Sequence, residues 1–218
     1  MRKILKNNYP GRLITFEGPE GAGKSTQLKL LAAYLCEKGF EVIVTREPGG
    51  TPLAEHLRSI VKAFEGEEKL HATTELLLIE AARSQHVREV IRPALAAGKM
   101  VLCDRYLDST AAYQGGGRSF DAKTIDLLND LAVAECVPDL TLLLDLSPEA
   151  GLSRTSKRVE TQFEHDRFEE ENLEFHRQVR ESYLAIAARN PERIRVLAAD
   201  RPVPEIFTEV RKWIDELI

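Results

Sequence analysis

Five short apolar runs divide this chain of 218 residues, and between them apolar residues recur every three or four positions. Continuous apolar runs of this length are typical of strands in a parallel sheet that is covered on both faces, and the longer spacing is that of helices with one buried side. The runs cover residues 13–16, 42–44, 100–103, 140–144 and 194–197. The pattern therefore predicts a three-layer α/β fold with five parallel strands, each buried on both faces and joined to the next by crossover helices.

Two of the connections between these runs are much longer than a crossover needs. Residues 45–99 hold two helical patterns around a charged loop. After the fourth run, the pattern predicts a helix over 148–157, a polar stretch over 158–166 and a long helix that ends near Arg189. We expect the first excursion to contribute a binding site and the second, which is basic over about 154–167, to form a lid above phosphates.

The composition is that of one globular domain that includes the whole chain, with 43% hydrophobic and 30% charged residues. A net charge of −5 provides no overall basic field for a nucleic-acid backbone, so no nucleic-acid partner is expected. The sequence shows neither an apolar stretch of membrane length nor a signal peptide, which favours a cytoplasmic protein without a membrane partner. Cys36, Cys103 and Cys136 lack the spacing of metal ligands and are predicted to be reduced thiols in the core.

The segment directly after the first run spells a phosphate-binding loop, G-x-x-x-x-G-K-S. Its glycines allow successive backbone N–H groups to turn toward a polyphosphate, and the helix that follows presents a partly positive N-terminus. Lys24 is expected to reach the β- and γ-phosphates, and Ser25 to offer its hydroxyl to the Mg²⁺ that they carry. A glycine-rich turn with a chance lysine is the alternative, which the strand–loop–helix context disfavours. The residues predicted to bind ATP are Gly18, Pro19, Glu20, Gly21, Ala22, Gly23, Lys24, Ser25 and Thr26.

Two further groups of polar residues stand at positions where ligand binding is expected. Asp104 and Arg105 end the third run, at the edge where open parallel sheets bind their ligands. An aspartate there can hold water on Mg²⁺ and an arginine can clamp a second phosphate, although a structural ion pair gives the same dipeptide. Arg83 interrupts the apolar stripe of its helix, so its charge faces the core and needs a partner. Either its stem reaches a carboxylate at the surface, or this helix face borders a polar ligand.

Four motifs, in their order and spacing, resemble those of the bacterial thymidylate kinase family. They are the loop over 18–27, R-E-P-G-G-T over 46–51, the pair Ala82-Arg83, and D-R-Y-L-D-S-T-A-A-Y-Q-G-G-G-R over 104–118. Very many proteins share the first motif, whereas the second and fourth together are specific to this family. The resemblance spans nearly the whole chain and leaves residues 1–11 as an N-terminal extension.

The resemblance implies that the γ-phosphoryl group of ATP is transferred to dTMP, giving dTDP and ADP with Mg²⁺, in the synthesis of dTTP. It implies that Arg105 binds the acceptor phosphate and that Arg83 forms a hydrogen bond to thymine. It also implies that Glu20 accepts a hydrogen bond from the 3′-hydroxyl of the acceptor; the alternative is that Glu20 is a solvated loop residue. Tyr113 is expected to stack over the deoxyribose and exclude a 2′-hydroxyl. A homodimer built from helices beside the core is also implied. The expected substrate contacts are Glu20, Arg46, Pro48, Ile79, Arg83, Arg105, Ser109, Thr110, Tyr113 and Gln114.

The sequence departs from the family at Ile79, where an aromatic residue usually stacks on thymine, so we expect weaker stacking or another ring in its place. The family divides by whether an extra catalytic cation sits in the P-loop or in the lid. Because Gly21 occupies the P-loop position, the cation is expected from the lid, where Arg154, Lys157 and Arg158 fall on one helix face. A solvated charged stripe is the alternative for that face. The residues expected to carry catalysis are Lys24, Asp104, Arg105, Arg154 and Arg158, with Ser25 and Asp104 at the metal.

Two rival functions stay open on the sequence alone. Another nucleoside monophosphate kinase or a deoxynucleoside kinase would use the same loop and sheet. A GTP-driven switch protein would also bind a nucleoside triphosphate, but the chain lacks the N-K-x-D tetrapeptide that reads guanine.

Overall fold

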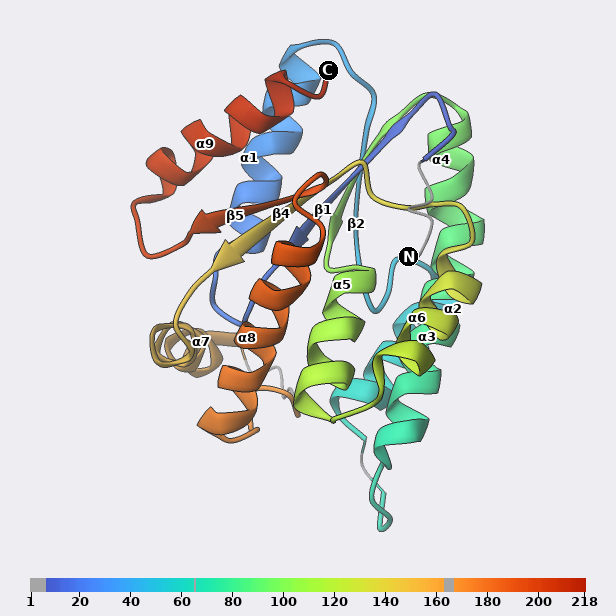
Figure 1. Cartoon of the computed structure of the whole chain (residues 1–218), viewed down its shortest axis with the longest axis vertical. Coiled ribbons are helices and arrows are strands. Elements are labelled where there is room, and N and C mark those ends of the chain that lie inside the picture. The colour runs from blue at the N-terminus through green and yellow to red at the C-terminus, as the bar shows by residue number, and fades with distance from the viewer. Residues whose placement is uncertain (1–6, 65, 163–166) are drawn as a thin grey trace.

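Five parallel strands form one sheet in the order β2-β3-β1-β4-β5 (Figure 1). The computed structural model describes the backbone of residues 7–64, 66–162 and 167–218, and the side chains of these except 156–162. Each apolar run is confirmed as a strand, and the α/β class is confirmed with it. The bounds are β1 Arg12–Glu17, β2 Val42–Arg46, β3 Met100–Asp104, β4 Leu140–Asp145 and β5 Ile194–Ala198.

Helices cover both faces of this sheet and complete the three layers. Helices α1 (Lys24–Glu37) and α9 (Val203–Asp215) cover one face, where they pack on Ile14 and Phe16 of β1. Leu13 points to the opposite face, as the two-residue period of a strand requires, and packs there with Val87, Leu95 and Val133. Besides α1 and α9, the helical segments in the described part of the chain are α2 Pro52–Lys62, α3 Ala72–His86, η1 Val87–Ile91, α4 Arg92–Ala96, α5 Leu107–Thr110, η2 Ala111–Gly117, α6 Ala122–Val133, α7 Pro148–Gln162 and α8 Leu173–Arg189.

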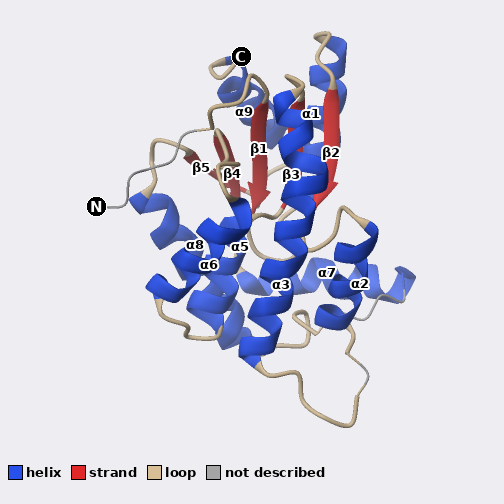
Figure 2. Cartoon of the chain, turned by 90° about the vertical axis from the view of Figure 1, so that its right-hand side faces the viewer, coloured by secondary structure: helices blue, strands red, loops and turns tan. Residues whose placement is uncertain are grey.

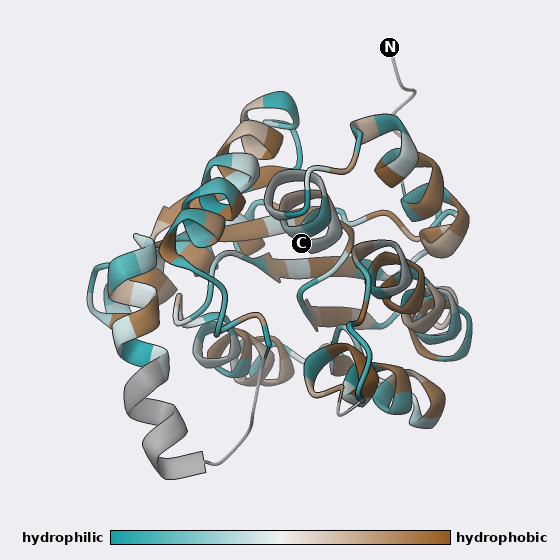
Figure 3. Cartoon of the chain, turned by 90° about the horizontal axis from the view of Figure 1, so that it is seen from below, coloured by the Kyte–Doolittle hydropathy of each residue, from teal (hydrophilic) through white to brown (hydrophobic). Residues whose placement is uncertain are grey.

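The apolar strands lie in the middle and the polar side chains at the periphery. Seen from below, the strands are predominantly brown, whereas the surrounding helices carry teal segments (Figure 3). In α1 the buried face is Leu28, Leu31 and Leu35, as the sequence predicts, and Gly39 follows the helix in the left-handed conformation, with φ 89°. In the described part of the chain no helix is long and apolar enough to cross a membrane.

Three predictions about exposure and length are wrong. The edge strands are not buried on both faces, since Val44 of β2 is 53% exposed and Val196 of β5 is 45% exposed. Each edge strand has a neighbour on one side only, and the sequence does not reveal strand order. Cys36 is exposed, because it lies one helical step beyond the buried face of α1, whereas Cys103 and Cys136 are buried; all three are free thiols. Finally, α7 continues past residue 157 to Gln162.

The carboxyl ends of all five strands meet at one edge of the sheet, because the strands are parallel. In Figure 2 the strands point toward the end of the molecule at which α2 and α7 lie. Phe16 of β1 is in register with Asp104 of β3, which in turn is in register with Arg46 of β2. The loops that follow these three strands therefore open on the same space.

Candidate active site

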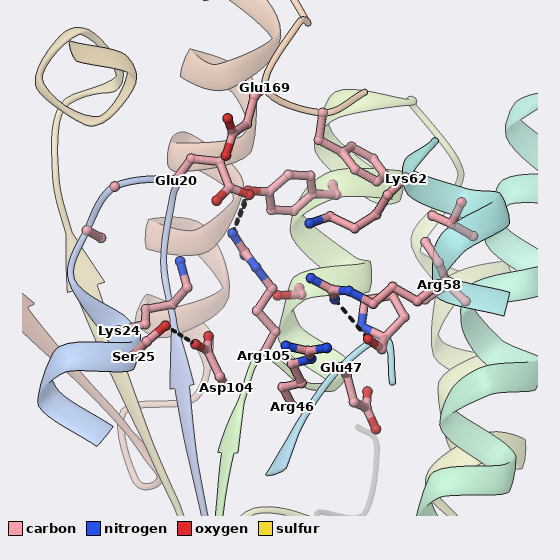
Figure 4. Close-up of a pocket in the computed structure, with 18 of the residues that line it drawn as sticks. Glu20, Lys24, Ser25, Arg46, Glu47, Arg58, Lys62, Asp104, Arg105 and Glu169 are labelled. Atoms are coloured by element: carbon pink, nitrogen blue, oxygen red, sulfur yellow. Dashed lines mark hydrogen bonds and ion pairs between the residues drawn. The ribbon is translucent and has the colours of Figure 1, made fainter. Parts of the chain in front are cut away.

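A cavity of about 440 Å³ lies at the carboxyl ends of the strands. Lys24 and Asp104 lie on one side of it, Arg46 and Arg58 on the other, and Arg105 lies between them (Figure 4). The predicted site residues that line it are Glu20, Gly21, Ala22, Gly23, Lys24, Ser25, Thr26, Arg46, Pro48, Ile79, Arg83, Asp104, Arg105, Ser109, Thr110, Tyr113, Gln114 and Arg154.

Three predicted residues are not among the lining residues. Gly18 and Pro19 are buried next to them in the same loop. The side chain of Arg158 lies outside the described residues, as does that of Lys157, so their roles stay predictions.

The loop after β1 is built around its glycines. Gly18 has φ 137° and Gly23 has φ 90°, in the left-handed region that favours glycine, and a Cβ on Gly18 would come within 2.3 Å of the Leu144 carbonyl. Lys24 folds under the loop, where its Nζ donates to the carbonyls of Gly18 at 3.1 Å and Pro19 at 2.9 Å. Burial, assisted by the positive charge of Arg105, lowers the pKa of Lys24 to about 8. The loop thus holds a buried cation directly below the space that a polyphosphate would fill.

Ser25 and Asp104 are brought together from α1 and the end of β3. The hydroxyl of Ser25 donates to Oδ2 of Asp104 at 2.7 Å, and Ser25 is exposed toward the cavity (Figure 4). Mg²⁺ binds through oxygen atoms, and in phosphate-transfer sites it takes one or two protein groups and completes its shell with water and phosphate oxygens. A hydroxyl and a carboxylate at one point, next to the phosphate loop, fit that requirement.

Arg105 links the two sides of the cavity. Its Nη2 donates to Glu20 at 2.6 Å and to the Tyr113 hydroxyl at 3.1 Å, and its Nη1 donates to the Gly18 carbonyl at 3.1 Å. Burial alone would raise the pKa of Glu20, but the charges of Arg105, Lys24 and other cations outweigh it and hold that pKa at about 2. Glu20 is therefore an ionised, paired carboxylate, and the alternative of a solvated loop glutamate is wrong.

Arg83 is 2% exposed, so it does not reach a carboxylate at the surface. Its Nε donates to Glu47 at 2.7 Å, and its Nη1 donates to Glu80 at 2.5 Å and to the Thr110 hydroxyl at 2.8 Å. Burial would lower the pKa of Arg83, but Glu80 and Glu47 raise it above its ordinary value. Since Arg83 also lines the cavity, its charge faces a polar space while buried carboxylates hold it.

The R-E-P-G-G-T motif places the loop after β2 against this arginine. Glu47 is 3% exposed and accepts from Arg83, while its other oxygen lies 2.9 Å from Nδ1 of His86. Gly50 passes so close to His86 that a Cβ would come within 2.4 Å of its Nε2. Thr51 then caps α2, since its hydroxyl oxygen accepts from the backbone N–H of Ala54. Sequence reasoning assigned no role to Glu47, although its place between Arg46 and Pro48 was a usable signal.

Comparisons with known proteins give the family of this chain. The family model described as thymidylate kinase matches residues 16–210. The chain belongs to the thymidylate kinase family. A thymidylate kinase of Magnetococcus marinus is 48% identical over 94% of this chain and 96% of its own length, and one of Geotalea uraniireducens is 51% identical over 89% and 92%. The crystal structure of thymidylate kinase from Ehrlichia chaffeensis superposes with a TM-score of 0.74, at 36% identity, and covers 94% of this chain and 98% of that one.

A buried carboxylate, Glu75 of α3, connects this helix to η2 and to the segment after α7. Glu75 is 1% exposed and accepts from Gln114 of η2 at 3.1 Å, from Arg118 at 3.2 Å and from Arg167 at 2.5 Å. Arg167 also donates its backbone N–H to the Lys62 carbonyl at the end of α2. Glu75 thereby joins three segments that are far apart in the sequence, and no local pattern pointed to it.

Several residues that line the cavity were not predicted from the sequence. Arg58 and Lys62 lie four positions apart on α2 and point at the cavity, and this helical spacing of two cations was a signal that could have found them (Figure 4). Phe168 and Glu169 line it from the segment after α7, where no pattern in the sequence pointed to them. The remaining missed lining residues are Glu47, Val61 and Thr155.

Ile79 lines the cavity, and the two aromatic residues among the lining residues, Tyr113 and Phe168, stand at other positions. The ring of Phe168 stands edge-on to Tyr113, with centroids 5.6 Å apart. An aromatic surface is therefore available to a base in this cavity, although position 79 is aliphatic.

The first turn of α7 rests directly on the phosphate loop. A Cβ on Gly21 would come within 2.4 Å of the Gly151 carbonyl, and a Cβ on Gly151 would come within 2.4 Å of the Glu20 carbonyl. Arg154, one turn later, donates to the carbonyls of Gly21 at 3.3 Å and Ala199 at 3.2 Å. In this arrangement Arg154 lies on the rim of the cavity and is held by backbone oxygens.

We predict that Gly151→Ala weakens ATP binding and turnover about tenfold, because overpacking typically costs about 1–3 kcal/mol and this methyl group would push on the phosphate loop. Helix propensity alone predicts the opposite sign, since alanine stabilises a helix interior by roughly 0.5–1 kcal/mol relative to glycine. Calorimetric titration with ATP and a thermal melt measure both effects. Ser153→Ala on the exposed side of α7 is the matched control. An unchanged ATP affinity in Gly151→Ala would contradict the contact argument.

Proposed function

We propose that this protein transfers the γ-phosphoryl group of ATP to the phosphate of dTMP, giving dTDP and ADP, as a single-domain cytoplasmic enzyme of dTTP synthesis. The observation that carries the proposal is that one cavity holds two anion sites. The phosphate loop with Lys24 forms one, and Arg105 forms the other, where it faces the same space. A kinase that joins a triphosphate to a monophosphate needs this arrangement, since the reaction depends on positioning both phosphates and neutralising their charge.

On the donor side, the backbone N–H groups of the loop and the N-terminus of α1 bind the triphosphate. Lys24 turns from the Gly18 and Pro19 carbonyls toward the phosphates, whose negative charge favours its ammonium form over the neutral amine that burial favours. Ser25 and Asp104 would hold Mg²⁺, which would neutralise part of the negative charge of the phosphates.

On the acceptor side, the phosphate of dTMP takes the place of Glu20 as partner of Arg105, and Glu20 becomes free to accept from the sugar hydroxyl. Tyr113, which is 6% exposed and packed edge-on against Phe168, leaves little room beside the sugar for a 2′-hydroxyl. Arg83, held in place by Glu47 and Glu80, would donate hydrogen bonds to the base. The other residues proposed to contact the acceptor are Arg46, Pro48, Ile79, Ser109, Thr110 and Gln114.

The test of this function is a panel of acceptors, namely dTMP, dUMP, UMP, dCMP and thymidine, with ATP and Mg²⁺. We expect kcat/KM to be highest for dTMP. Phosphorylation of thymidine should be negligible, because thymidine has no phosphate group for Arg105 to bind. Lys24→Ala should abolish turnover with every acceptor, since the lost cation contacts charge that develops during transfer. Its melting curve serves as the folding control. Preference for another acceptor, or near-normal turnover in a folded Lys24→Ala protein, would refute the assignment.

We further propose that the lid supplies the extra catalytic cation, as in the family members with arginines there. Two observations support this. The Gly151 carbonyl occupies the space that a side chain at position 21 would need, and Arg154 of α7 lies at the rim of the cavity. A small movement would transfer Arg154 from the Gly21 carbonyl to a phosphate next to it. Arg158 lies one turn further along α7.

We predict that loss of the lid arginine lowers kcat about 10³- to 10⁵-fold with little change in ATP affinity, because such a residue acts on charge that appears only in transfer. Single-turnover transfer from ATP to dTMP should be measured for Arg154→Ala, Arg158→Ala and the double variant. We expect Arg158→Ala to be at least as damaging as Arg154→Ala. Wild-type rates in all three variants would show that the arginines of α7 only form a solvated helix face.

We also propose a homodimer through helices α3 and α6, which pack side by side. Three large apolar side chains are exposed on them: Leu77 at 52%, Leu127 at 69% and Leu131 at 71%. Apolar side chains gathered in this way on a soluble protein mark an interaction surface, and a second copy of the chain is the occupant that the family implies.

We predict that the double variant Leu127→Glu/Leu131→Glu is monomeric, since two carboxylates in an apolar interface would stay unpaired. Sedimentation equilibrium or light scattering after gel filtration measures the mass. Val203→Glu is the control, because Val203 is 43% exposed on α9 at the opposite face of the sheet. A wild-type protein that is monomeric at micromolar concentration would contradict the proposal.

A further inference from the structure

Glu17, the last residue of β1, is a buried carboxylate that does not line the cavity. It is 1% exposed and accepts four hydrogen bonds. The donors are the backbone N–H groups of Tyr106 at 2.8 Å and Ser109 at 3.2 Å, the Ser109 hydroxyl at 2.6 Å and the Tyr183 hydroxyl at 3.0 Å. They come from the turn after β3, from α5 and from α8, so one carboxylate joins three elements to the strand that precedes the phosphate loop.

These donors surround Arg105. The Nη1 of Arg105 lies 3.3 Å from the Ser109 hydroxyl and 3.2 Å from the Tyr183 hydroxyl. A hydroxyl has one proton and two lone pairs. Because an ionised Glu17 only accepts, it draws the protons of these hydroxyls to itself and leaves their lone pairs facing the guanidinium.

Arg105 also stands in a backbone conformation that a residue with a side chain rarely adopts, with φ 67°. Such a conformation persists only where neighbouring groups fix it. Here β1 fixes the peptide groups on both sides, since the Arg105 N–H donates to the Phe16 carbonyl at 2.9 Å and the next N–H, of Tyr106, donates to Glu17.

We propose that Glu17 is the positioning residue of Arg105: its carboxylate holds the left-handed turn and orients the Ser109 and Tyr183 hydroxyls, so that the guanidinium faces the acceptor phosphate. The proposal rests on the proposed function in one respect, that Arg105 binds this phosphate. Glu17 itself touches neither substrate, because the phosphate loop and Arg105 lie between it and the cavity.

The ionisation of Glu17 makes this role measurable. Burial, then the charge of Asp108 on α5, raise the pKa of Glu17 to about 7, although Ser109, Arg105 and the Tyr106 N–H lower it. The other ionisable groups whose charge interacts with that of Glu17 are Lys24 below the loop, Cys103 on β3, Tyr183 on α8 and Arg193 before β5.

Stability and positioning then depend on pH with opposite signs. A carboxyl group with a raised pKa in the folded protein favours the fold when protonated, so this contribution is present below about pH 4.5 and is lost as pH rises through 7. A protonated Glu17 must instead donate its proton, which disturbs the hydroxyls that face Arg105. Positioning therefore improves over the same interval in which stability declines.

The decisive variant is Glu17→Gln, compared with the wild type between pH 5.5 and 9. The ratio of the two kcat/KM values for dTMP cancels the ionisation of the substrate, since both enzymes meet the same nucleotide. We expect the wild type to exceed the variant about 10- to 100-fold at pH 8.5, the loss that follows when a hydrogen bond to a charged group is disturbed, and the ratio to approach one below pH 6. The melting temperature of the wild type relative to the variant should fall as pH rises.

Two further measurements separate this role from a general structural one. Calorimetry should show weaker dTMP binding in Glu17→Gln, with ATP affinity within about threefold of the wild type. The variant Tyr183→Phe keeps the carboxylate and removes a hydroxyl that lies outside the cavity and links Glu17 to Arg105; it should lose dTMP affinity in the same way, and it decides the question if Glu17→Gln does not fold. A ratio that does not vary with pH, or equal losses of ATP and dTMP affinity, would overturn the proposal. An inactive wild type would refute the proposed function instead, and dTMP binding would then still decide the role of Glu17.

Discussion

The ion pair between Arg105 and Glu20, at 2.6 Å, is the contact on which the arrangement of the site depends. It joins the end of β3 to the phosphate loop after β1, and so connects the side that fits a triphosphate to the side that fits a monophosphate. Parallel strand order makes the pair possible, since β1 and β3 are neighbours and end at the same edge. In the proposed function a phosphate group replaces this carboxylate, so Glu20 would preserve the position of the guanidinium in the absence of an acceptor.

Three buried carboxylates repeat one device around the cavity. Glu17 holds the surroundings of Arg105, Glu47 holds Arg83, and Glu75 holds Arg167 in the segment after α7. Removing two charges from water is costly, and a buried ion pair seldom adds net stability over well-packed apolar residues. What such pairs do provide is a fixed direction for the cation. Arg83 and Arg105, which line the cavity, are therefore held as oriented positive charges, which is the pattern expected where a site must neutralise phosphates.

The sequence predicts the sheet and the phosphate loop because both depend on local pattern. The central strands are continuous apolar runs, and Lys24 and Ser25 stand at fixed positions in one motif. The predicted burial of the two edge strands is wrong, as at Val44, because the order of the strands in the sheet is a property of the whole fold. Glu75 could not be found, since its partners lie some 40 and 90 residues away in the chain. Glu17 was equally hidden, because a glutamate that ends an apolar run looks like an ordinary strand terminus.

The two glycines at the junction of loop and lid give a steric reason for where the catalytic cation can lie. Position 21 is filled by the backbone of Gly151, and position 151 by the backbone of Glu20, so neither has room for a Cβ while α7 rests on the loop. A cationic side chain at position 21 and this close contact are therefore mutually exclusive. The contact therefore supports the proposal that the extra cation comes from α7, whose Arg154 already lies against the Gly21 carbonyl.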